Sequence, residues 1–191
     1  TRRSSDLYLV ISKFFKKIKS KITREQNLDN LIRMGLKVGK NLSKQRQVEI
    51  DYSHCWLISI GDDVGLAARV SILAHDASTK KYLGYTKIGL VSIGNKTFIG
   101  AGSIILPNVN IGNNVIIAAG SVINKDVPDG FVVGGNPAKI ICSTESYVSR
   151  QNENMKRRPI YDESWTTRKN ITCEMKNKMI NQLKNGIGYV E

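Results

Sequence analysis

Residues 91–141 read VSIGNKTFIGAGSIILPNVNIGNNVIIAAGSVINKDVPDGFVVGGNPAKII and carry the pattern that decides the fold. Within this stretch one aliphatic residue returns at a strict spacing of six. An α-helix needs apolar residues three and four apart, and a half-buried strand needs them two apart, so neither accounts for this interval. The interval is typical of the hexapeptide repeat of a parallel β-helix. The repeating positions are Ile93, Ile99, Ile105, Ile111, Ile117 and Ile123.

The residues between the aliphatic positions predict how each repeat is built. A small residue follows most of the repeating positions, namely Gly94, Gly100, Gly112 and Ala118. We expect a tight corner there, because Gly leaves room and tolerates unusual φ values. Three flat faces then close a triangular coil of about eighteen residues, and successive coils stack at roughly 4.8 Å. The stack buries an aliphatic column that one repeat could not bury alone.

The same phase extends upstream and is interrupted once. The interval from Ile72 to Ile93 is 21 residues, three more than one coil, so a loop must leave the stack. That loop is expected to begin at about His75. The upstream inward positions are expected at Ile60, Leu66 and Ile72 and, by counting back, at His54, Val48, Leu42 and Leu36.

The chain divides into a repeat region and two flanks. The N-terminal flank alternates apolar residues with lysines as in an amphipathic basic helix, and a second short helix follows it. The C-terminal flank loses the six-residue spacing and contains another helical pattern. The predicted fold class is therefore mainly β, a parallel β-helix with flanking N- and C-terminal α-helices. The predicted ranges are 1–35 for the basic segment with helices at 6–22 and 26–34, 36–142 for the β-helix with a loop at about 76–88, and 143–191 for the extension with a helix at 174–183.

The net charge of +13 is unevenly distributed along the chain. Residues 1–46 hold 13 Lys or Arg against 3 acidic residues, whereas residues 47–142 hold 7 against 7. No nucleic-acid-binding motif or aromatic stacking set accompanies the basic flank, so nucleic-acid binding is disfavoured. The basic helix either docks its apolar face on the repeat core or a sister subunit, or adsorbs to anionic lipid.

The cysteines and the hydropathy indicate the cellular compartment in which the protein is expected. Cys55, Cys142 and Cys173 lack metal or redox spacing and indicate reduced thiols. No apolar run has the length of a membrane span, and no signal peptide is visible. We therefore expect a cytoplasmic protein, with peripheral contact at the inner face of the membrane if the basic helix adsorbs there.

The sequence contains only two histidines. His75 stands where the repeat gives way to a polar loop, which favours a functional role for its imidazole. His54 falls on the counted-back inward phase, so it is either a structural histidine in a weak first coil or a residue near an acceptor pocket.

The chain resembles a known family, the hexapeptide-repeat (left-handed β-helix) acyltransferases. Within them it resembles the sugar O-acetyltransferase group, which includes maltose, galactoside, nodulation-factor and capsular-polysaccharide acetyltransferases. The left hand of the coil is taken from this resemblance. The matching motifs are LAHD at 73–76, IGN at 93–95, FIGAG at 98–102, ILP at 105–107, IG at 111–112, AGSVINKDVP at 119–128 and GNPAK at 135–139.

The resemblance implies a direct acetyl transfer without an acyl-enzyme. A hydroxyl is a poor nucleophile at neutral pH, and imidazole has the matching pKa to accept its proton, so His75 is the expected general base. The resemblance places a main-chain oxyanion donor at Ala101. Asp76 either shapes the acceptor pocket or caps the loop. The expected acceptor-binding residues are Asp76, Tyr82, Tyr85 and His54.

Acetyl-CoA is the implied donor, a saccharide is the implied acceptor, and no metal is required. The resemblance also implies a homotrimer with active sites between subunits. Lys125 and Lys139 would lie beside the phosphorylated nucleotide, or else form an ordinary solvated coil edge. Cys142 stands where some relatives carry a second basic residue. The implied donor contacts are Ala101, Ala119, Asn124, Lys125 and Lys139.

Three other function classes share parts of this pattern. An N-acetyltransferase acting on an amino or nucleotide sugar would use the same fold and base, and it stays open as the alternative. A non-enzymatic scaffold would neither bind CoA nor release a thiol from acetyl-CoA. A β-helix carbonic anhydrase needs three histidine ligands for zinc, which two histidines in the chain do not comfortably supply.

Overall fold

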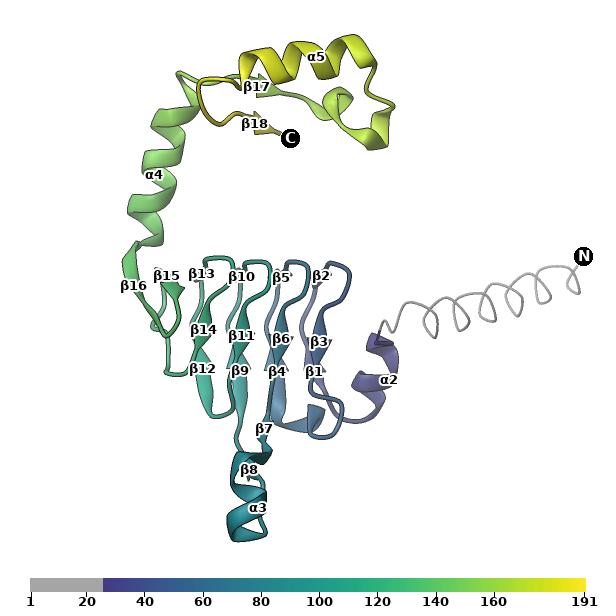
Figure 1. Cartoon of the computed structure of the whole chain (residues 1–191), viewed down its shortest axis with the longest axis vertical. Coiled ribbons are helices and arrows are strands. Elements are labelled where there is room, and N and C mark those ends of the chain that lie inside the picture. The colour runs from purple at the N-terminus through teal and green to yellow at the C-terminus, as the bar shows by residue number, and fades with distance from the viewer. Residues whose placement is uncertain (1–25) are drawn as a thin grey trace, which may run out of the picture. The chain divides into compact units, whose positions relative to one another are not determined.

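A computed structural model describes residues 26–191, which form two compact units divided at Thr144 and Glu145 (Figure 1). The predicted amphipathic helix at residues 6–22 lies outside the described residues. The second predicted helix is present as α2 (Leu28–Arg33), where the Asn27 side chain accepts the Asp29 N–H as an N-cap. Among residues 26–191, no helix is both long and apolar enough to span a bilayer.

The first unit is a prism of stacked three-strand coils (Figure 1). Each coil contributes one short strand to each of three sheets, and neighbouring strands in a sheet come from successive coils and run parallel. The predicted parallel β-helix is therefore confirmed. The four coils consist of β1 (Lys37–Val38), β2 (Ser43–Lys44) and β3 (Glu49–Ile50); β4 (Ile58–Ile60), β5 (Gly65–Leu66) and β6 (Ser71–Ile72); β9 (Val91–Ile93), β10 (Phe98–Ile99) and β11 (Ile104–Ile105); and β12 (Val109–Ile111), β13 (Ile116–Ile117) and β14 (Val122–Ile123).

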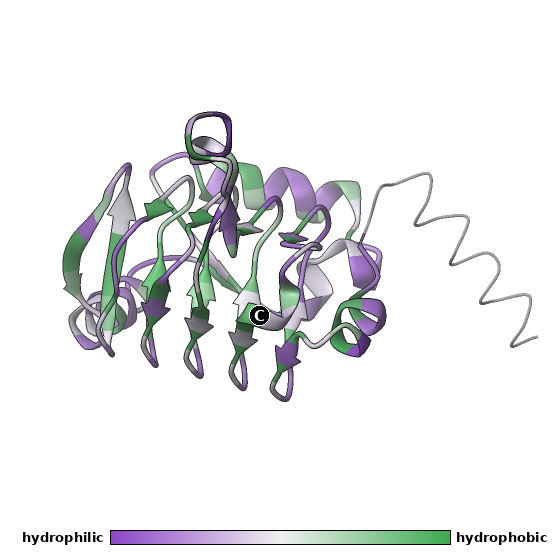
Figure 2. Ribbon diagram, turned by 90° about the horizontal axis from the view of Figure 1, so that it is seen from below, coloured by the Kyte–Doolittle hydropathy of each residue, from purple (hydrophilic) through white to green (hydrophobic). Residues whose placement is uncertain are grey.

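The repeating aliphatic residues form the core as predicted. Leu66 pairs with Ile99, and Ile99 pairs with Ile117, so equivalent side chains stack directly above one another. Figure 2 shows hydrophobic segments recurring in each successive coil. All six positions from Ile93 to Ile123 are at most 3% exposed. Burial of this column supplies the main driving force for the fold, because each fully buried aliphatic side chain contributes roughly 1.5–3 kcal/mol.

The lack of room expected at the glycine corners is confirmed, whereas the unusual φ expected there is wrong. A Cβ added at Gly100 would meet the Ala119 backbone nitrogen at 2.5 Å, and Gly94 and Gly112 are similarly close to the next coil. None of these three glycines has a positive φ. The left-handed backbone conformation instead occurs three residues after the aliphatic position. Those residues are Asp63, Arg69, Lys96, Gly102, Asn108, Asn114 and Gly120, with φ between 53° and 71°.

The first coil does not follow the phase obtained by counting back in steps of six. Ile50 pairs with Ile72, and Val38 pairs with Ile60, a separation of 22 residues and not 18. The extra residues form an insertion after β3 that contains the 3-10 turn Cys55–Leu57. Counting by six across an insertion necessarily loses the register, so His54 belongs to the insertion and not to the aliphatic column. Val48 and Leu36 are nevertheless buried, as interior neighbours of that column.

A hairpin leaves the prism between β6 and β9 (Figure 1). Ile93 pairs with Ile60, so it is the next inward position of the stack after Ile72. A regular repeat would cover that interval with six residues. The segment that leaves the prism between β6 and β9 is therefore longer than the three extra residues counted from the sequence. It starts with β7 (His75–Asp76), which pairs antiparallel with β8 (Lys87–Ile88). Between them lie a 3-10 turn (Ala77–Thr79) and α3 (Lys80–Leu83).

The C-terminal end of the prism is closed by a hairpin of β15 (Phe131–Gly135) and β16 (Ala138–Ser143), with β15 parallel to β13. The second unit follows, and the helix predicted at 174–183 is present in it. Its elements are α4 (Thr144–Met155), β17 (Ile160–Tyr161), the 3-10 turns Glu163–Trp165 and Thr167–Lys169, α5 (Cys173–Gln182) and β18 (Tyr189–Val190), which pairs with β17.

Two glycine substitutions on one corner separate crowding from backbone strain. We expect Gly100→Ala to destabilise the protein by about 1–3 kcal/mol, since its Cβ would collide with the backbone of the next coil. Gly102→Ala meets nothing within 4 Å and costs only the left-handed conformation at φ +70°, about 1 kcal/mol. Urea denaturation monitored by circular dichroism measures both. A larger loss for Gly102→Ala would contradict the crowding explanation.

Candidate active site

An aspartate and a histidine from consecutive coils meet at one edge of the prism. Asp51 directly follows β3, and His75 begins the hairpin that follows β6. Since β3 pairs with β6, the ends of these strands lie side by side. His75 Nδ1 lies 2.5 Å from Asp51 Oδ2, with side-chain exposures of 36% for His75 and 1% for Asp51. The imidazole is thus held from behind by a buried carboxylate while part of its ring faces solvent.

The Asp51 carboxylate is surrounded by hydrogen-bond donors. Its Oδ2 also accepts the Ala74 N–H at 2.9 Å, and its Oδ1 accepts the Ser53 hydroxyl at 2.9 Å and the His54 N–H at 3.2 Å. Burial raises the pKa of Asp51, but the hydrogen bonds from His75, Ala74 and Ser53 together outweigh it and lower the pKa below its ordinary value. Asp51 is therefore an anion at neutral pH.

This arrangement determines which imidazole nitrogen can act. An anionic carboxylate accepts a hydrogen bond from Nδ1–H, so Nε2 of His75 is left with its lone pair in the neutral ring. The same carboxylate stabilises the imidazolium that forms when Nε2 takes a proton, as an aspartate does in serine protease triads. His75 and Asp51 together have the geometry of a general-base dyad.

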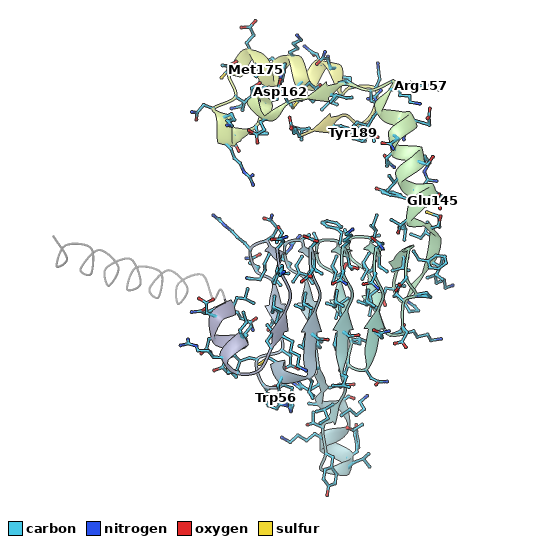
Figure 3. All side chains as sticks on the ribbon, turned by 180° about the vertical axis from the view of Figure 1, so that it is seen from behind. Trp56, Glu145, Arg157, Asp162, Met175 and Tyr189 are labelled. Atoms are coloured by element: carbon cyan, nitrogen blue, oxygen red, sulfur yellow. The ribbon has the colours of Figure 1, made fainter. Side chains whose placement is uncertain are left out.

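His54 lies next to the dyad and is not packed in the interior. Its ring centroid is 5.2 Å from that of His75 and 5.3 Å from that of Trp56. The Ser53 oxygen lies 3.0 Å from His54 Nδ1. Because the Ser53 hydroxyl gives its proton to Asp51, its oxygen can accept the His54 Nδ1–H. Figure 3 shows Trp56 on the side of the prism from which the hairpin leaves.

Potential ligand atoms of Asp51, His54 and His75 all lie within 4.8 Å of one another, as they would in a metal site. Both oxygens of Asp51 are already engaged by N–H and O–H donors. The hydrogen bonds account for the charge and orientation of the cluster, and we assign it to proton transfer. The prediction that no metal is required is kept.

Asp76 is engaged within the hairpin. Its Oδ1 accepts the Ser78 N–H at 2.8 Å, and its Oδ2 pairs with Lys87 at 2.6 Å. The hydrogen bond from Lys87, followed by those from Ser78, lowers the pKa of Asp76 to about 2. This is the geometry of the loop-capping alternative, and contact with an acceptor stays a prediction. Tyr82 and Tyr85 are 81% and 80% exposed on the outer part of the hairpin.

The residues expected to hold the donor fall on two different edges. Ala101 and Ala119 occupy equivalent corners between β10 and β11 and between β13 and β14. Asn124, Lys125 and Lys139 line a separate cavity of about 50 Å³. Ala101 is not brought to His75 within one chain, because the two stand at opposite edges of the sheet that contains β6 and β11. Asn124 and Lys125 follow β14 and so stand at the same edge as His75, but two coils further along.

The Ala101 main chain is available as a donor. Its carbonyl accepts the Gly120 N–H at 2.8 Å, whereas its own N–H donates no hydrogen bond within residues 26–191. A free backbone N–H at a rigid corner suits the role of an oxyanion donor, which stays a prediction for Ala101.

Sequence reasoning missed two residues of the site. They are Asp51 and Trp56, which the sequence assigned to no site. Both lie on the first-coil insertion, whose existence the counting by six concealed. The available signal was an acidic residue directly after the aliphatic Ile50.

Comparison with known proteins places this geometry in a family. The profile described as "Bacterial transferase hexapeptide (six repeats)" matches residues 91–125. Protein CapG of Staphylococcus aureus is 43% identical over 139 residues, which cover 69% of this chain and 79% of CapG. The chain belongs to the hexapeptide-repeat acyltransferases. The resemblance stated from the sequence is thereby confirmed, together with the enzyme class and the left hand of the coil.

Two solved structures show the same architecture. A maltose O-acetyltransferase from Clostridium difficile 630 is 28% identical with a TM-score of 0.51, and the match covers 69% of this chain and 84% of that one. A hexapeptide-repeat-containing acetyltransferase from Vibrio cholerae, complexed with acetyl coenzyme A, is 26% identical with a TM-score of 0.51. That match covers 58% of this acyltransferase and 61% of the Vibrio chain.

The ionised form of Asp51 should stabilise the fold in a pH-dependent way. Because the folded-state pKa lies below the unfolded value near 3.8, the carboxylate stabilises the protein above that pH. The contribution is lost as pH falls through the folded-state pKa. We expect Asp51→Asn to cost about 1–3 kcal/mol at pH 7, since hydrogen bonds to a buried charge are lost, and to cost less below pH 3.8.

Urea denaturation between pH 2.5 and pH 7 measures this difference. Glu49→Gln, an exposed substitution on the strand that precedes Asp51, is the matched control. A difference between wild type and Asp51→Asn that stays constant or grows toward low pH would contradict the depressed pKa.

Proposed function

We propose that this protein transfers the acetyl group of acetyl-CoA to a hydroxyl of a saccharide, in the modification of bacterial surface polysaccharide. The single observation that carries the proposal is the contact between His75 and the buried, anionic Asp51 at 2.5 Å. It is supported by the similar solved structures, which include a maltose O-acetyltransferase and an acetyltransferase complexed with acetyl coenzyme A.

The reaction uses the dyad as a base and then as an acid. Acetyl-CoA supplies an activated acyl carbonyl. His75 Nε2 removes the proton of the acceptor hydroxyl as its oxygen attacks this carbonyl, and Asp51 stabilises the resulting imidazolium. The Ala101 N–H donates to the oxyanion of the tetrahedral intermediate. When the carbon–sulfur bond breaks, the imidazolium returns its proton to the CoA sulfur, and the products are an acetyl ester and free CoA.

The separation of the site residues supports a homotrimer. His75 and Ala101 stand on different edges of one prism, so both reach the same carbonyl only if they come from two subunits. A closed symmetric ring uses the same pair of edges at every interface and leaves none unpaired. In this assembly Tyr82 and Tyr85 contact the acceptor from an adjoining hairpin.

The donor and the compartment complete the proposal. Lys125 and Lys139, which are neighbours at one cavity, are placed beside the phosphates of CoA together with Asn124, while Ala119 lies along the donor next to Ala101. We place the protein in the cytoplasm, where acetyl-CoA is made, with the basic N-terminal segment available for peripheral contact with the membrane.

Substitution of the base tests the proposal directly. We expect His75→Ala to lower kcat for thiol release from acetyl-CoA by at least about a hundredfold, which is the usual contribution of a general base. Asp51→Asn should lower it by at least about tenfold, because it no longer orients Nδ1–H. Thiol release with a panel of neutral and amino sugars measures this, with Lys81→Ala on the exposed hairpin as the control.

The outcomes are distinct. Full activity in His75→Ala would refute the mechanism. Acetylation of amino sugars alone, with products resistant to mild alkali, would replace the O-acetyltransferase by the N-acetyltransferase.

Mixed assemblies test whether the site is shared between subunits. His75→Ala and Ala101→Pro, which removes the N–H, should each be inactive alone. Co-expressed, each supplies what the other lacks at one interface of every mixed trimer, so activity should return to on the order of a quarter of wild type. Size-exclusion chromatography with light scattering verifies the trimer. No recovery in verified mixed trimers would show that each chain builds its own site.

A further inference from the structure

A pocket of about 420 Å³ lies on the face formed by β1, β4, β9 and β12, and no role has been assigned to it. Its floor is a row of polar side chains in register from coil to coil, since Ser59 pairs with Ser92 and Ser92 pairs with Asn110. Each of these residues stands between two buried neighbours, so its side chain points outward. The floor residues are Lys37, Ser59, Ser92 and Asn110.

The wall of this pocket is aromatic and leads to the catalytic base. Trp56 lines the pocket and is 50% exposed, although it is a large hydrophobic side chain. Its ring lies 5.3 Å from His54, and His54 lies 5.2 Å from His75. Each ring-to-ring step is about the width of one pyranose ring. His54 and His75 do not themselves line the pocket, so a saccharide in contact with Trp56 needs a length of about two rings to extend to His75.

The chemistry of the lining fits a saccharide. The axial C–H bonds of a pyranose ring carry partial positive charge, which the negative face of an indole attracts. Hydroxyl and amide side chains on the floor match the donors and acceptors of sugar hydroxyls, and a few placed polar groups in a pocket fix orientation. The Ser92 hydroxyl donates to Asn110 Oδ1 and so orients the Asn110 side chain, while the Asn110 backbone N–H donates to Asp126 Oδ1 at 2.8 Å.

The same lining is poorly suited to the phosphorylated end of CoA. The pocket contains one cationic residue, Lys37, together with the carboxylate of Asp126. A cluster of phosphates at this place would face an acidic group with a single lysine to balance it. The smaller cavity also contains Asp126, but it has two lysines to balance that charge, Lys125 and Lys139, neither of which lines the larger pocket.

We propose that this pocket is the acceptor subsite, in which one ring of a saccharide stacks on Trp56 and hydrogen-bonds to Ser59, Ser92 and Asn110, while the adjoining ring presents a hydroxyl to His75 beside His54. This assignment rests on the proposed function and specifies where its substrate binds. The first-coil insertion then has two tasks, since it carries both the carboxylate that orients the base and the aromatic wall that holds the acceptor.

Tryptophan fluorescence tests binding without requiring catalysis. The chain has two tryptophans, so Trp165→Phe leaves Trp56 as the only one. This variant is titrated with glucose, galactose, maltose, N-acetylglucosamine and N-acetylneuraminic acid, and separately with CoA. We expect at least one saccharide to change the Trp56 emission in a saturable way. If no saccharide changes it, or if only CoA does, the assignment is overturned.

Kinetics then separates the acceptor from the donor. For the saccharide that gives the largest emission change, Trp56→Ala should raise the acceptor KM about tenfold and leave the KM for acetyl-CoA unchanged. Tyr52→Ala is the matched control, since Tyr52 is 57% exposed on the same insertion but does not line the pocket. An unchanged acceptor KM in Trp56→Ala overturns the assignment.

The two proposals fail in different ways. If saccharides change the Trp56 emission but no thiol is released with any of them, the acetyltransferase function falls and the saccharide subsite stands. If thiol is released with a saccharide that leaves the emission unchanged, the function stands and the subsite falls.

Discussion

Hydrogen bonding between successive coils is the constraint on which the rest of this structure depends. Every face of a coil must return to the same register above the coil before it, because its backbone N–H and C=O groups are satisfied only by neighbouring strands. The six-residue spacing, the stacked aliphatic column and the glycines at the corners all follow from this requirement. At Gly100 the backbone of the next coil is so close that no side chain fits.

A stack that cannot change its register can only vary by adding residues at a corner. This protein does so twice at the same edge, after β3 and after β6. The first insertion carries Asp51, His54 and Trp56, and the second begins with His75. Since β3 and β6 are hydrogen-bonded neighbours, the two insertions are adjacent in space although more than twenty residues separate them in sequence. A rigid scaffold thereby holds the carboxylate and the imidazole in fixed geometry, which is what general-base catalysis requires.

The position of the base at an edge has a consequence for assembly. The N–H of Ala101, which donates no hydrogen bond within residues 26–191, lies on a different edge of the prism from His75. Sharing a site between identical subunits is the economical solution for such a shape, since a rotation can bring different edges of equal prisms together. The polar face with Trp56 next to His75 gives the acceptor its own surface, distinct from the cavity that Lys125 and Lys139 share.

The sequence by itself determined the repeat architecture from Ile60 to Ile123, because each aliphatic position is tied to its neighbours by a fixed spacing. It also singled out His75, which stands where that spacing is interrupted. It did not determine the register of the first coil, the partner of His75 or the place of His54. A local pattern carries no information on how many residues an insertion removes from the stack. Only the tertiary structure decided these points, since pairing of Ile50 with Ile72 sets Asp51 behind the imidazole and brings Trp56 to the pocket.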